Sequence, residues 1–168
     1  MKKTVIRYGL YGALTICLLF LFSWYVLGDL SFSTQEVIGY ASMVISLAFV
    51  YFGIKHFRDK ENHGKVNFKK ALTLGVLISL ITAVTFGLLD VLFTEVLNPE
   101  FMEEYYEATV KSMRDSLPPD EFEVQLAEIE SQKEMFSNPI FSFALMGMTV
   151  FVIGFIISLI SALILQRK

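Results

Sequence analysis

The chain has 168 residues, of which 54% are hydrophobic, and its mean hydropathy is +0.56. Average soluble domains contain about 45–50% apolar residues even with glycine counted, so this composition excludes an ordinary soluble protein. The formal net charge of −3 also argues against nucleic-acid binding, which usually shows a basic surface.

Four apolar runs without a single Asp, Glu, Lys or Arg dominate the chain. They cover residues 8–27, 37–54, 71–89 and 140–165. A helix needs roughly 20 apolar residues to cross a hydrocarbon core of about 30 Å, and it satisfies its own backbone hydrogen bonds where water is absent. We therefore predict a single all-α membrane domain over residues 1–168, a four-helix bundle with spans at about 6–27, 35–57, 68–94 and 139–165.

The second span opens at a predicted capping box, in which Ser33 and Glu36 satisfy each other's exposed backbone N–H groups. The span leads into a basic segment, residues 53–70, which holds six of the fourteen Lys and Arg residues against Asp59 and Glu61. Short positive loops stay on the cytoplasmic side of a membrane. We therefore expect a multi-pass protein with both termini in the cytoplasm.

The same basic segment is a candidate interaction site. Lys55, Arg58 and Asp59 are its candidate functional residues, and either an anionic lipid headgroup or an acidic protein would suit its charge. The alternative is a loop whose charge serves topology alone. Its two histidines, His56 and His63, are seven residues apart and have no cysteine beside them, so we predict no metal site.

The third span starts at a predicted N-cap, Asn67, and carries a stripe of small residues. Gly75, Ser79, Ala83 and Gly87 recur every four residues, and the fourth span shows a looser version with a spacing of seven in Gly147, Gly154 and Ser161. Small faces let membrane helices approach closely. We predict that the stripe packs on another span of the same chain; the alternative is a second copy, which would make the protein a homo-oligomer.

Asp90 is the one acid contiguous with an apolar span. An ionisable residue within a bilayer is a functional candidate because it is costly there. Asp90 lies at the outer end of its span, where water or a Ser or Thr partner can reach it. We favour a hydrogen-bonded interfacial acid, with an ion-handling group as the alternative.

Residues 98–138 between the third and fourth spans are strongly acidic, with eleven acidic and three basic residues. Asn98-Pro99 and Asn138-Pro139 predict helix starts, and Pro118-Pro119 predicts a break between two helices. Apolar residues follow helical spacing on both sides of that break. We predict an acidic extracytoplasmic helical hairpin whose apolar residues pack on each other, on the ends of the spans or on a partner.

The sequence carries no nucleophile, phosphate-binding or metalloprotease motif, so we predict no catalytic residue and no cofactor. We expect a non-enzymatic interaction or accessory protein whose partners are the bilayer and a further membrane or periplasmic protein. The alternative is a small carrier or ion-conducting protein that uses Asp90.

A longer pattern surrounds the basic loop: Tyr51-Phe52-Gly53-Ile54-Lys55-His56-Phe57-Arg58-Asp59, followed by Gly64, Phe68, Ala71, Leu72 and Gly75. This pattern resembles the family called domain of unknown function 4199, a group of small bacterial membrane proteins, mostly from Bacteroidota. The resemblance covers essentially the whole chain. It implies four spans and an inner-membrane location, and it brings no activity, substrate or catalytic residue.

Overall fold

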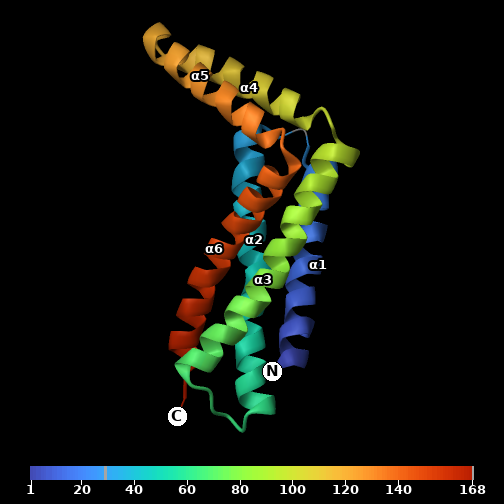
Figure 1. The fold of residues 1–168 in the computed structure, drawn as a ribbon, viewed down its shortest axis with the longest axis vertical. Coiled ribbons are helices and arrows are strands. Elements are labelled where there is room, and N and C mark those ends of the chain that lie inside the picture. Colours follow the sequence, from blue (N-terminus) through green and yellow to red (C-terminus); the bar gives the residue numbers. More distant parts are fainter. Residues whose placement is uncertain (29, 168) are drawn as a thin grey trace. The chain divides into compact units, whose positions relative to one another are not determined.

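The computed structural model describes residues 1–28 and 30–167, with every side chain in that range except those of Gln132 and Glu134. The described residues form six α-helices and two short π-helical segments and contain no β-strand (Figure 1). The predicted all-α class is confirmed.

Four of the helices are long and apolar enough to cross a membrane. They are α1 (Lys2–Val26), α2 (Phe32–His56), α3 (Phe68–Leu92) and α6 (Pro139–Leu165). The π-helical segments η1 (Phe57–Glu61) and η2 (Phe93–Leu97) continue α2 and α3 without a break. The predicted four-helix membrane bundle is confirmed.

Exposed apolar side chains show what surrounds these helices. On α1, Leu10, Leu14 and Leu18 recur every four residues and are 56%, 61% and 58% exposed. Leaving a leucine exposed to water forgoes about 1.5–3 kcal/mol of stabilisation, whereas lipid tails are as apolar as leucine itself. A continuous stripe of this kind therefore faces lipid.

The chain divides into two compact units. The first, Met1–Phe86 with Met146–Lys168, contains α1, α2 and the adjoining lengths of α3 and α6. Its core is built from fully buried side chains contributed by all four helices, among them Ile16, Leu47, Ile78 and Val150.

The second unit, Gly87–Leu145, contains the remaining turns of α3 and α6 together with two helices between them. These helices are α4 (Phe101–Ser116) and α5 (Pro119–Phe136), which lie side by side as an antiparallel pair (Figure 1). The break at Pro118 falls where the sequence predicts it, since Pro119 opens α5.

Two predicted helix starts are confirmed. The Asn67 side chain accepts a hydrogen bond from the Lys70 N–H at 2.9 Å and caps α3. The Asn138 side chain accepts one from the Ile140 N–H at 3.0 Å, and α6 begins at Pro139. Each cap satisfies an N–H group that has no partner within its helix.

Two other predicted starts are wrong by about two residues. Helix α2 begins at Phe32, and its N-cap is Ser31, whose side chain accepts from the Thr34 N–H at 3.4 Å. Ser33 is therefore already inside the helix and forms no capping box with Glu36. Helix α4 begins at Phe101, because Asn98 closes the preceding π-helical turn through its N–H to the Phe93 carbonyl at 2.8 Å.

Candidate functional site

The middle of the α3–α6 contact is a reciprocal pair of glycines and serines. The Ser79 and Ser158 hydroxyl oxygens are 3.2 Å apart, and each also lies within hydrogen-bond distance of the carbonyl oxygen of the glycine four residues before it, at 3.0 Å for Gly75 and 2.6 Å for Gly154. A Cβ atom at Gly75 would lie 2.8 Å from the Cβ of Ser158, and one at Gly154 would lie 2.6 Å from the Cβ of Ser79. Both glycines are therefore required for this approach of the two helices.

The rest of the small stripe contacts α6 of the same chain as well. A Cβ atom at Gly147 would lie 3.4 Å from the Ala83 carbonyl oxygen, and one at Gly87 would lie 2.8 Å from the Phe143 ring and carbonyl. Ser161 is 4% exposed, on the face of α6 that continues one turn beyond Ser158. We call this contact, centred on Gly75, Ser79, Gly154 and Ser158, the Gly–Ser seam.

Asp90 lies buried in the second unit, with a side chain of α6 as its partner. It is 9% exposed, and the Ser142 hydroxyl donates to its carboxylate oxygen Oδ2 at 2.5 Å. The Thr94 hydroxyl donates to the Asp90 backbone carbonyl at 3.0 Å. Burying a carboxylate is costly unless hydrogen bonds compensate it, so Ser142 stabilises Asp90 at this depth.

Arg58 is buried at the end of the first unit that contains residues 57–67 and both chain ends (Figure 1), which we call the loop end. Its guanidinium pairs with both carboxylate oxygens of Asp59, at 2.6 Å from Nε and 3.1 Å from Nη2. The remaining Nη1 donates to the Leu165 carbonyl at 3.4 Å. The last carbonyls of a helix have no partner within it, so Arg58 satisfies one at the end of α6.

Other contacts at the loop end tie the basic segment to both ends of the chain. The Glu61 carboxylate accepts from the Thr4 hydroxyl at 2.5 Å and from the Met1 ammonium at 2.9 Å. The backbones of Val66 and Arg167 exchange two hydrogen bonds, of 3.0 and 2.8 Å. The loop end is thus an ordered structure that fastens α1, α2, α3 and α6 together.

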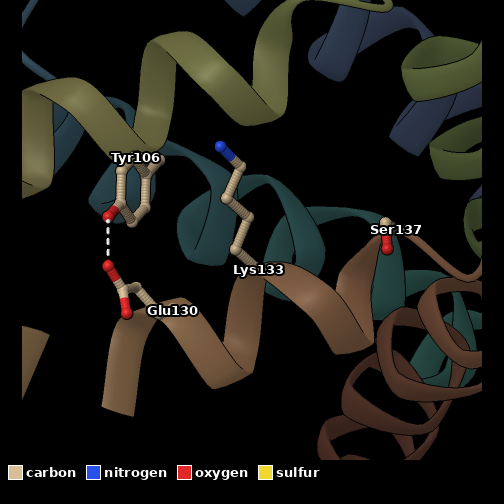
Figure 2. Close-up of a pocket in the computed structure, with 4 residues that line it drawn as sticks. All are labelled: Tyr106, Glu130, Lys133 and Ser137. Atoms are coloured by element: carbon tan, nitrogen blue, oxygen red, sulfur yellow. Dashed lines mark hydrogen bonds between the residues drawn. The ribbon is translucent and has the colours of Figure 1, made fainter. Parts of the chain in front are cut away.

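The α4–α5 hairpin is held by polar contacts between its two arms. Lys133 pairs with Glu103 at 2.7 Å and lies over the Tyr106 ring at 4.4 Å, while the Tyr106 hydroxyl donates to Glu130 at 3.3 Å. Figure 2 shows Tyr106, Glu130, Lys133 and Ser137, which line a hollow of about 370 Å³. Partial removal from water, assisted by the negative charge of Glu130, raises the pKa of Tyr106.

Aromatic pairs anchor the hairpin to η2 and to the first turn of α6 within its own unit. The Phe93 and Phe101 ring centroids are 5.4 Å apart, and those of Phe136 and Phe141 are 6.0 Å apart. Both pairs are edge-to-face, the arrangement that the charge distribution of aromatic rings favours.

The model of one protein family matches residues 7–167, and that family is described as "Protein of unknown function (DUF4199)". The chain belongs to this family. A search of the curated proteins and a search of the solved structures each found no match. The family resemblance carried by the basic loop is thereby confirmed, and its description names no activity.

The DUF4199 chain brings together only some of the predicted site residues. Lys55, Arg58 and Asp59 share the loop end, whereas Asp90 belongs to the other unit. Within the part of the chain that the structure describes, no group of three or more His, Cys, Asp and Glu side chains is arranged to hold a metal ion.

Sequence reasoning did not identify three partner residues, although it expected a Ser or Thr beside Asp90. Ser158, Ser142 and Thr4 contact Ser79, Asp90 and Glu61 respectively. A signal existed for the first, because Gly154 and Ser158 repeat the Gly-x-x-x-Ser spacing of Gly75 and Ser79. Thr4 and Ser142 carry no such signal, since isolated hydroxyl residues in membrane helices usually bond to their own backbone.

Proposed function

We propose that this DUF4199 protein is a non-enzymatic membrane protein that acts by binding a partner protein through its α4–α5 hairpin. The supporting observation is that bases of the hairpin have partners within it, whereas most of its acids are exposed. Two of its three bases are engaged within it, Lys133 with Glu103 and Tyr106, and Arg114 over the Phe122 ring at 5.7 Å. Most of its eleven acids remain on the exposed surface.

The hairpin also leaves apolar side chains uncovered. Met113 is its one buried apolar residue among those described, at 9% exposure, while Val124 and Tyr105 are 71% and 40% exposed. Two short helices can bury little apolar area by themselves, and isolated helices of this length are marginal in water. A partner with an apolar centre and basic groups around it would complement this surface in both respects.

Purification of the intact protein from its native membrane in mild neutral detergent tests this function. We expect a stoichiometric partner to copurify with the wild type and to be lost from a variant carrying Glu107→Gln, Glu121→Gln and Glu123→Gln. All three side chains are exposed, so the substitutions leave the fold intact. Glu36→Gln removes another exposed acid, near the start of α2, and should keep the partner; retention by the triple variant would contradict the proposal.

We propose that the protein lies in an inner membrane with both termini on the cytoplasmic side and the hairpin on the extracytoplasmic side. The six bases of residues 53–70 support this orientation, because Lys and Arg concentrate in the cytoplasmic loops of membrane proteins. Reporter fusions at the C-terminus and within residues 53–70 should read cytoplasmic, and a fusion within residues 118–134 should read extracytoplasmic. An extracytoplasmic signal from the C-terminal fusion would contradict this topology.

A second candidate function is ion or proton handling through Asp90. The support is that Asp90, an ionisable residue of a candidate membrane-spanning helix, is buried and accepts a hydrogen bond from Ser142. If this candidate is correct, purified protein in proteoliposomes will pass ions or protons, and Asp90→Asn will abolish the flux while the helix content stays unchanged. Flux that depends on Asp90 would overturn the accessory function; equal background leakage from both proteins would exclude the carrier.

A further inference from the structure

At the loop end of the bundle, the described acidic side chains have partners and several of the described basic side chains do not. Among the described residues its carboxylate side chains are Asp59 and Glu61, and both are engaged by neighbours: Asp59 by Arg58 at 2.6 Å and Glu61 by the Thr4 hydroxyl at 2.5 Å. Three bases nearby, Lys60, Lys65 and Lys69, are exposed, and no hydrogen bond or ion pair joins their side chains to the described residues. These two acids are thus compensated, and the three exposed lysines are not.

The surplus is most concentrated around Asp59. This single carboxylate pairs with Arg58 and also lies within electrostatic range of Lys55 and Arg167. Three cations therefore share one anion. Arg58 is 9% exposed on its side chain and already satisfied, whereas Lys55 and Arg167 are exposed, which makes them the groups available to a further anion.

Lys55 and Arg167 come from different elements, and the backbone of each is held by hydrogen bonds. Lys55 lies in the last turn of α2. Arg167 follows α6, and its backbone is paired in both directions with Val66 of the loop. The Arg58 hydrogen bond to the Leu165 carbonyl joins the end of α2 to the end of α6, so the backbones that carry the two cations are held at the same end of the unit before any anion arrives.

The apolar residues beside these cations indicate which anion they meet. Phe52, three residues before Lys55 on the same side of α2, is 52% exposed. Leu163 and Ile164, just before Arg167, are 53% and 64% exposed. The lipid-facing surface therefore extends as far as Lys55 and Arg167, which places these cations at the level of the lipid headgroups. At that level a long basic side chain can lay its apolar stem along the apolar surface and direct its charged group toward the headgroups.

We propose that the loop end binds the phosphate of an anionic phospholipid headgroup, with Lys55 and Arg167 as the contacting cations. Buried Arg58 acts as a positioning residue: it occupies the Asp59 carboxylate and so keeps Lys55 and Arg167 available. This site is independent of the hairpin function and does not depend on which way the protein faces across the membrane.

Binding of fluorescent phosphatidylglycerol to the intact protein in neutral detergent micelles, followed by anisotropy, tests the proposal. We expect tighter binding than for the phosphatidylcholine analogue. Lys55→Gln and Arg167→Gln should each weaken binding about fivefold, the factor typical of one base near an anionic lipid surface. Both side chains are exposed, so helix content and elution volume should match the wild type.

Lys111→Gln is the matched control, because Lys111 is an exposed base of α4, outside the proposed site. Its affinity for phosphatidylglycerol should equal that of the wild type. Equal binding of the two lipids, unchanged affinity in the Lys55 and Arg167 variants, or an equal loss in the Lys111 variant would overturn the proposal. Displacement of the lipid by inorganic phosphate at matched ionic strength would assign the site to a soluble anion instead.

Discussion

Gly154→Ala should destabilise the protein by about 1–3 kcal/mol, the usual cost of forcing extra atoms into a packed interface. The added Cβ would lie 2.6 Å from the Cβ of Ser79 and 3.1 Å from a methyl group of Leu47. The α3 and α6 backbones must then separate, which weakens the Ser79–Ser158 hydrogen bond. Thermal unfolding in neutral detergent, followed by circular dichroism, measures the change.

Two control variants separate the steric effect at the Gly–Ser seam from the general effect of replacing glycine by alanine in a helix. Gly39 has nothing within 4 Å of an added Cβ atom, so Gly39→Ala should be neutral or stabilise α2 by up to about 1 kcal/mol. Combining Gly154→Ala with Ser79→Gly removes the clashing atoms and should recover part of the lost stability. If Gly154→Ala and Gly39→Ala melt at the same temperature, the two helices do not meet closely at the seam.

Arg58→Gln should also destabilise the protein, through the loop end. Removing one partner of a fully buried ion pair costs roughly 3–5 kcal/mol. Asp59 is 34% exposed, so water compensates part of that loss, and we expect about 1–3 kcal/mol. The variant also leaves the Leu165 carbonyl without its donor.

The chemical character of Arg58 can be separated from its charge by a second substitution. Arg58→Lys keeps the positive charge but cannot reproduce a guanidinium that bonds two carboxylate oxygens and a carbonyl at once. Its melting temperature should fall between those of the wild type and Arg58→Gln. Lys60→Gln changes an exposed base two residues away and should leave the melting temperature unchanged. If the Lys60 and Arg58 variants lose equal stability, the contacts of Arg58 with Asp59 and Leu165 do not stabilise the loop end.

The four spans are predictable from the sequence because a membrane allows few alternatives. Uncharged runs such as residues 71–89 have to be helical where water is absent, and a periodic small face has to meet another helix to gain packing energy. These constraints predict that Gly75 and Ser79 pack on another helix, but they do not identify that helix as α6 of the same chain. To predict that Ser158 is the partner, one must know which face of α6 meets α3. The sequence of α6 is apolar on all sides and does not show this.

Arg58 illustrates what the sequence does not specify. Its position in a basic loop predicts a solvent-exposed group available to a partner, yet it is buried. The carbonyl it caps belongs to Leu165, 107 residues further along the chain, and no local pattern reports a contact of that range. Helix starts fail for a different reason: Ser31 and Ser33 are equally good caps in isolation, so the local sequence does not choose between them.

Hydrogen exchange of the purified full-length protein tests the central claim most directly, because a hairpin must be folded to present a binding surface. We expect slowed exchange of backbone amides in both α4 and α5. Protection should be strongest near Met113, the most buried hairpin residue described, and near the Tyr106–Glu130 contact. Complete exchange within the dead time of the experiment throughout residues 101–136 would show an unstructured segment and contradict the proposed function.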